Sequence, residues 1–182
     1  NGSGPTGPTV VMAHGWGSNK SEMLDRAGVL HDTYNLLLVD LRNHGQSGEA
    51  ATTQGVREAG DLRVMIDWLE RNKGPQSIAL FGVSMGGATA IAEADRDDRV
   101  DALIIESTHA TLANAAQARL EIAGYPLAMP GSWAILLGSL MRTGEDVSSV
   151  DPVQGVERLD DRPVLLIYGG GDAAIGPGAA DQ

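Results

Sequence analysis

The sequence predicts an α/β fold in which a mostly parallel sheet is sandwiched between helices. Five short apolar runs alternate with longer segments of helical periodicity, which is typical of parallel strands joined by crossover helices. The runs are apolar throughout, as expected for strands that are covered on both faces. A length of 182 residues with 42% hydrophobic residues is enough to bury one core. We therefore expect a single domain over residues 1–182.

The expected strands follow one another at short intervals. They cover Thr9–Ala13, Leu36–Val39, Ser77–Phe81, Ala102–Ile105 and Pro163–Tyr168. Between the second and third strands, apolar residues recur every three or four positions from Val56 to Leu69, which predicts an amphipathic helix. Thr52 or Thr53 is expected to cap its start, and Gly74-Pro75 to end it. A further helix is expected over Met85–Ala94, directly after the third strand.

The segment from Ala110 to Arg162 is too long for one crossover helix and is interrupted by proline and glycine. Two or three short helices are expected in it. They cover about Leu112–Ala123, Trp133–Met141 and Val153–Leu159. An insertion between strands either forms a cap over a site or is a surface excursion without a gating role, and the sequence leaves both open.

Composition excludes several classes of function. Twenty-four acidic and thirteen basic residues give a net charge of −11, which disfavours a nucleic-acid partner. No apolar run is long enough to predict a membrane-spanning helix. Because there is no cysteine, disulfides and thiolate chemistry are excluded, and the compartment stays open. The four histidines lack zinc-ligand spacing, so we expect no metal, and no cofactor is indicated.

The pentad Gly82-Val83-Ser84-Met85-Gly86 joins the third strand to a helix. So abrupt a turn forces its central residue into a strained backbone conformation and exposes that side chain at the carboxyl edge of the sheet. Glycines two residues before and after remove side chains that would collide. The helix start offers free N–H groups to a developing oxyanion. Ser84 is thus a candidate nucleophile, and the alternative is an ordinary serine in a helix cap.

A second loop at the same sheet edge can supply another N–H group. The first strand ends in His14-Gly15-Trp16-Gly17, and the two glycines allow the backbone to come close to a ligand. Trp16 is therefore a candidate donor to an oxyanion. The alternative is a glycine-rich turn that packs a tryptophan.

These motifs together resemble those of the α/β-hydrolase fold enzymes, most closely the esterase- and peptidase-like branch with a short helical cap. The resemblance includes the His-Gly-x-Gly-like turn, the segment Asp40–Gly48, the turn at Ser84 and the segment Leu166–Asp172, in the family's order. It spans nearly the whole chain. It implies that the strands lie in the order second, first, third, fourth, fifth, with two more strands upstream and one downstream.

The resemblance also implies roles for four residues. Ser84 would be the nucleophile and Asp172 the acid that orients a histidine, while Trp16 and Met85 would donate the oxyanion N–H groups. Asp172 also fits by its own spacing, because it follows Tyr168 by four residues and a carboxylate there reaches the same rim as Ser84.

The triad histidine is missing from the place that the resemblance implies. In the family it follows the acid by a few dozen residues, whereas the sequence ends ten residues after Asp172. His109, just past the fourth strand, is an alternative base, although a pocket or structural role is favoured. His14 and His44 lie in tight turns and are expected to bond to backbone. We interpret the chain as a fragment lacking both ends, inactive if it lacks the histidine.

The leading hypothesis is a serine hydrolase that cleaves an ester, thioester or amide of a small acyl substrate through an acyl-enzyme on Ser84. One alternative is a non-catalytic binding module with the same fold. Another is a Rossmann-type dinucleotide-binding domain, which Gly15-x-Gly17 and Asp40 match superficially. Lys20 stands where its third glycine is required. We expect Asp40 instead to pair with Arg42 and hold the turn.

Overall fold

The computed structural model describes residues 6–75 and 77–169, which form one parallel sheet in the order β2-β1-β3-β4-β5. The strands are β1 (Thr9–Ala13), β2 (Asn35–Val39), β3 (Ile78–Val83), β4 (Val100–Glu106) and β5 (Val164–Ile167). The expected parallel sheet and its strand order are confirmed. All five strands lie within two residues of the predicted bounds.

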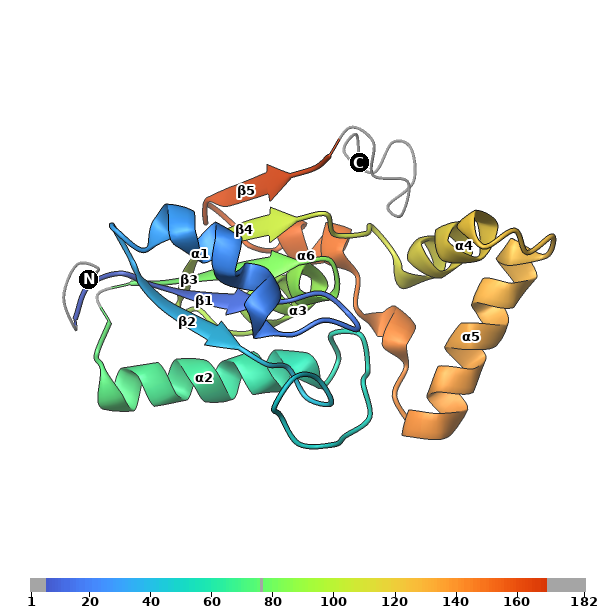
Figure 1. The fold of residues 1–182 in the computed structure, drawn as a ribbon, viewed down its shortest axis with the longest axis horizontal. Helices are drawn as coiled ribbons and strands as arrows, with labels where there is room; N and C mark the ends of the chain where they lie inside the picture. Colours follow the sequence, from blue (N-terminus) through green and yellow to red (C-terminus); the bar gives the residue numbers. More distant parts are fainter. Residues whose placement is uncertain (1–5, 76, 170–182) are drawn as a thin grey trace.

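Helices cover both faces of this sheet (Figure 1). The helices are α1 (Leu24–Leu30), α2 (Glu58–Asn72), α3 (Met85–Ala94), α4 (Leu112–Ile122), α5 (Ala128–Thr143) and α6 (Pro152–Glu157), with short 3-10 turns η1 (Lys20–Met23) and η2 (Val147–Ser149). Helix α1 lies on one face, and α2, α3 and α6 lie on the other. This is the predicted sandwich.

The side chains of β1 explain why its sequence is apolar throughout. Val11 and Ala13 join the core cluster that contains residues of α2 and α3. Val10 and Met12 join the cluster with Met23, at the start of α1. Successive strand residues point to opposite faces, so a strand covered on both sides needs no polar position.

Strand β5 differs from this expectation. It pairs only with β4 among the described strands, and Leu165, Leu166 and Ile167 are 55%, 49% and 39% exposed. The prediction that every strand is covered on both faces is therefore wrong for β5, because the described helices leave much of its surface uncovered.

Helix α2 begins at Glu58, later than predicted, and neither Thr52 nor Thr53 is its N-cap residue. The fully buried Glu58 carboxylate instead accepts hydrogen bonds from the N–H of Thr53 (2.8 Å), its hydroxyl (2.7 Å) and the N–H of Gly55 (2.9 Å). The carboxylate thus organises the loop that enters α2. Helical periodicity could not predict this, since a glutamate in a first turn usually faces water.

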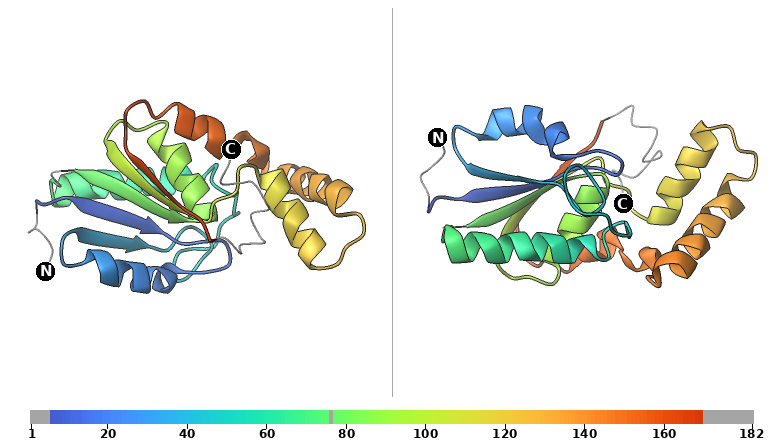
Figure 2. Two further views of the ribbon diagram at one scale, coloured as in Figure 1. Left: turned by 90° about the horizontal axis from the view of Figure 1, so that it is seen from above. Right: turned by 60° about the horizontal axis from the view of Figure 1, so that its bottom comes forward.

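Helices α4 and α5 pack against each other beyond the carboxyl ends of the strands (Figures 1 and 2). Helix α5 begins at Ala128, five residues before the predicted start. The prediction treated Pro130 as an interruption, whereas this proline lies in the first turn of the helix. Proline is tolerated there, since an N–H in the first turn has no partner within the helix. None of the helices in residues 6–75 and 77–169 is both long and apolar enough for a membrane span.

Candidate active site

Ser84 occupies the turn between β3 and α3 in a backbone conformation that side chains rarely adopt, with φ 53° and ψ −115°. Its N–H donates to the Glu106 carbonyl of β4 (2.9 Å), and its own carbonyl accepts from the N–H groups of Gly87 and Ala88. The surrounding elements therefore hold the strained turn in place. Within the described part of the chain, the Ser84 hydroxyl has no hydrogen-bond partner.

The glycines around Ser84 are required by the close approach of other backbone. A Cβ atom at Gly82 would overlap the backbone of Gly86, and one at Gly86 would overlap the carbonyl of Ala13 on β1. The predicted steric reason for both glycines is thus confirmed. Gly87, which the pentad does not include, is also crowded, because a Cβ there would overlap the side-chain hydroxyl of Thr108.

The loop that carries Trp16 is held on both sides of the tryptophan. The N–H of Gly15 donates to the Glu22 carboxylate (3.1 Å), and the N–H of Gly17 donates to Nε2 of His44 (3.1 Å). A Cβ at Gly15 would lie 3.6 Å from Cβ of Ser84, so the loop runs beside the serine. The N–H of Trp16 itself donates to no group among residues 6–75 and 77–169.

His14 and His44 both bond to backbone, as the sequence predicted. Nδ1 of His14 donates to the Gly15 carbonyl (2.7 Å), and its Nε2 accepts from the N–H of Leu41 (3.2 Å). His44 likewise uses Nδ1 for the Arg42 carbonyl and Nε2 for Gly17. Burial, together with the nearby His44 ring, lowers the pKa of His14. Both rings therefore hold the loops after β1 and β2 through backbone groups.

Asp40 does not pair with Arg42, so that prediction is wrong. Its carboxylate accepts from the N–H (2.7 Å) and Nζ (2.6 Å) of Lys20 and from the N–H of Gln46 (3.0 Å). Burial alone would raise the pKa of Asp40, but these hydrogen bonds outweigh it and lower the pKa to about 2. Arg42 instead binds Asp61 of α2 through Nε and Nη2. Asp40 is thereby committed to the loop and is not free to bind a ribose.

A cavity of about 360 Å³ lies between the carboxyl edge of the sheet and helices α4 and α5. It is lined by Trp16, Thr52, Gln54, Ser84, Met85, Ser107, His109, Leu112, Ala115, Ala116, Arg119, Leu120, Ile135, Leu136, Ser139 and Val147. Three of the four predicted site residues therefore meet here, namely Ser84, Met85 and Trp16. The fourth, Asp172, lies outside the described residues.

His109 also lines the cavity, on the rim where the sequence placed it. Burial, reinforced by the charge of Arg119, lowers the pKa of His109 to about 4. The ring is therefore neutral at pH 7 and too weak a base to take a serine proton efficiently. No hydrogen bond joins this ring to the described residues, so no carboxylate among them orients it.

Arg119 is a cavity residue that the sequence reasoning missed. Its guanidinium lies 5.6 Å from the centre of the Trp16 ring, across the gap between α4 and the loop after β1. The signal was present in the sequence, because Arg119 follows Leu112 by seven residues and Ala115 by four. These intervals place a cation on the apolar stripe of α4.

The arrangement offers a hydroxyl, adjacent N–H groups and an apolar chamber. Met85 is the first residue of α3, so its N–H has no acceptor within the helix and can donate to a ligand. An electrophilic carbonyl carbon could be attacked by the serine while its oxygen is held by these donors. In the described ranges, no three His, Asp or Glu side chains are grouped to hold a metal ion.

Comparison with known proteins gives matches over most of the chain. The model of the alpha/beta hydrolase fold family matches residues 8–135. The chain is 29% identical over 171 residues to the uncharacterized protein YfhR of Escherichia coli O157:H7, covering 92% of this chain and 53% of that protein. It is 36% identical over 105 residues to the thiohydrolase aneE of Aspergillus aculeatus, covering 54% and 33% respectively. The chain spans about half the length of its first curated relatives.

Solved structures share the same architecture. The Pyrococcus furiosus esterase Pf2001 aligns with a TM-score of 0.63 at 24% identity, covering 88% of this chain and 72% of that one. The α/β hydrolase GrgF from Penicillium sp. sh18 aligns with a TM-score of 0.69 at 22% identity, covering 96% and 75%. At these identities the likeness shows the fold.

Proposed function

The chain belongs to the α/β hydrolase fold family, and we propose on that basis that it carries the nucleophile of a serine hydrolase that cleaves a small ester, thioester or amide. The observation that carries the proposal is that Ser84, in its strained backbone conformation, lines the cavity together with Met85 and Trp16. A thiohydrolase among the curated relatives and esterases among the structural neighbours support the same class.

The proposed reaction proceeds through an acyl-enzyme. Oγ of Ser84 attacks the carbonyl carbon while a base takes its proton, and the oxyanion that forms accepts hydrogen bonds from the N–H groups of Met85 and Trp16. The tetrahedral intermediate collapses and the bond to the leaving group breaks, and that group departs with the proton. Water then attacks the acyl-enzyme, which releases the carboxylic acid and regenerates the hydroxyl.

We propose that the base is a histidine that would follow Asp172 in a protein of the length of the curated relatives, and that Asp172 orients it. The histidines of the described region are poor candidates. His14 and His44 are engaged with backbone groups. His109 has a pKa of about 4 and lacks an orienting carboxylate among the described residues.

The test compares Ser84→Ala with Ser139→Ala in the full-length protein, because both serines line the cavity. Hydrolysis of p-nitrophenyl butanoate should fall by about 10³-fold or more in Ser84→Ala. It should change little in Ser139→Ala, and His109→Gln should keep its activity and pH profile. A phosphonate ester should label Ser84, as read by mass spectrometry. Unchanged turnover in Ser84→Ala, or loss of turnover in His109→Gln alone, would overturn the proposal.

A further inference from the structure

The cavity combines an apolar wall with one cation, Arg119, that has no carboxylate partner among the described residues. Of its lining residues in the described ranges, Arg119 is the one with a formal charge at neutral pH, because the pKa of His109 is about 4. The neighbouring wall on α4 and α5 includes Leu112, Leu120 and Leu136. Arg119 is exposed to solvent as well as to the cavity, so its charge can be offered to an anion that enters from the open side.

Arg119 has no carboxylate partner in the described part of the chain, although this chain is rich in acidic residues. Six of the ten other arginines lie within 4.0 Å of a carboxylate oxygen, namely Arg26, Arg42, Arg57, Arg63, Arg99 and Arg158. Arg71, Arg96, Arg142 and Arg162 also have no carboxylate partner among the described residues, but none of them lines the cavity. The aromatic ring of Trp16 is the partner found for Arg119, and that contact leaves the in-plane N–H donors of the guanidinium free.

Arg119 lies in the same cavity as the proposed reacting groups. It shares the cavity with Ser84, and it touches Trp16, the residue that carries one of the proposed oxyanion donors. A group bound at the guanidinium would therefore lie in the same chamber as an ester bound at the serine. The volume of about 360 Å³ suits one small molecule that reaches both.

We infer that the substrate of this site is a small ester or thioester that also carries a carboxylate, and that Arg119 binds this carboxylate through its forked N–H donors. The planar fork of a guanidinium matches the two oxygens of a carboxylate, which a lysine cannot reproduce. The net negative charge of the chain would otherwise disfavour an anionic substrate, so Arg119 determines specificity. This inference rests on the proposed hydrolase function.

The experiment uses matched substrates with the full-length protein. Mono-p-nitrophenyl glutarate and p-nitrophenyl pentanoate have the same chain length and differ in the terminal carboxylate. Arg119→Gln should lower the ratio of their kcat/KM values by about 10- to 100-fold, through the KM of the glutarate ester, and Arg119→Lys should lower it less. Arg142→Gln, an equal change of charge on α5 outside the cavity lining, should leave the ratio unchanged.

A second arm separates this inference from the proposed function. Calorimetry on Ser84→Ala should detect glutarate binding that weakens when Arg119→Gln is added, and pentanoate should bind weakly to both. If hydrolysis does not depend on Ser84 but glutarate binding still depends on Arg119, the hydrolase proposal is refuted and the carboxylate site is retained. A ratio and a glutarate affinity that are both unchanged in Arg119→Gln would overturn the inference, and would reduce Arg119 to a contact between α4 and Trp16.

Discussion

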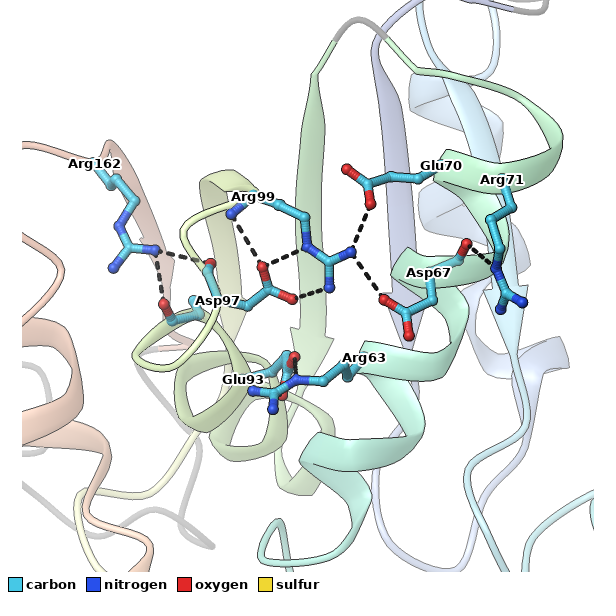
Figure 3. A network of polar contacts seen from close by, with 9 residues as sticks. Arg63, Asp67, Glu70, Arg71, Glu93, Asp97, Arg99 and Arg162 are labelled. Atoms are coloured by element: carbon cyan, nitrogen blue, oxygen red, sulfur yellow. Dashed lines mark hydrogen bonds and ion pairs between the residues drawn. The ribbon is translucent and has the colours of Figure 1, made fainter.

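Two groups of arginine contacts at opposite ends of the sheet differ in how completely their charges are paired. Arg99 directly precedes β4 and binds Asp97, Asp67 and Glu70 (Figure 3). Arg119, beyond the carboxyl ends of the strands, has an aromatic ring as its partner and no described carboxylate. The first arrangement ties the end of α2 to the loop before β4, and the second leaves donors available to a ligand.

Backbone strain is distributed in a similar way. Of the five non-glycine residues with positive φ in the described ranges, Asn43, Gln54, Ser84 and Ser107 follow the carboxyl ends of strands β2, β3 and β4, and Asp160 precedes β5. Strained conformations persist where the surrounding structure holds them and are concentrated at functional sites. Ion pairs also occur near the carboxyl ends, such as Lys20–Asp40 and Arg26–Glu106. The contrast with the Arg99 network therefore lies in Arg119 and the strained Ser84, in the part of the molecule that we propose acts on substrate.

The largest effect on stability is expected at the strained end. Gly86→Ala would place a Cβ in the carbonyl of Ala13, and this backbone cannot move without distorting β1. We expect a loss of about 3 kcal/mol or more in the free energy of unfolding, measured by urea denaturation of the full-length protein. Gly138→Ala in α5 is the matched control, because nothing lies within 4 Å of the added atom. It should stabilise the protein by roughly 0.5–1 kcal/mol.

Equal losses for the two glycine substitutions would remove the contrast between the tight turn and the exposed helix. This result would show that the backbone around Ser84 moves easily to accept a Cβ, so steric crowding would not explain the strained conformation of Ser84.

The strands of the sheet could be predicted because each strand is specified by a short continuous run of apolar residues. The apolar runs in β1, β3 and β4 are each a continuous stretch, and β1 and nearly all of β3 are buried. The turn at Ser84 is also local, since glycine spacing and an abrupt change of periodicity report it. Strand order came from the family resemblance, because no pattern within one strand specifies its neighbours.

The features that were missed depend on contacts between distant residues. The pairing of Asp40 with Lys20 spans twenty positions, and nothing in the segment after β2 distinguishes it from a pairing with Arg42. Glu58 is fully buried, although composition alone places charged residues on the surface, and the exposed Arg119 also lines the cavity. Only the packed structure shows that one is satisfied by a loop and the other faces a chamber.

A second prediction tests the paired end directly. Arg99→Gln leaves the Asp97 side chain, which is 6% exposed, without its main partner. The hydrogen bond from Arg99 lowers the pKa of Asp97, so its ionised form would lose its stabilisation. We expect a loss of about 2 kcal/mol, less than for a fully buried pair because Arg99 is partly exposed. Thermal unfolding measures this, and kcat/KM for any ester should stay unchanged. A change in kcat/KM at unaltered stability would mean that the two ends are coupled.

The smallest loss of unfolding free energy, about 1–2 kcal/mol, is expected for Asp40→Asn. This substitution tests whether the Asp40 carboxylate stabilises the fold or binds substrate. The folded pKa of about 2 lies below the ordinary value of 3.8, so folding favours the ionised carboxyl. The stability that it contributes is complete above pH 4 and is lost as the pH falls toward 2. The difference in unfolding free energy between the wild type and Asp40→Asn should therefore be constant from pH 7 to 5 and shrink from pH 4 to 3. A constant difference across that range, or an altered KM without loss of stability, would place Asp40 in the substrate site instead.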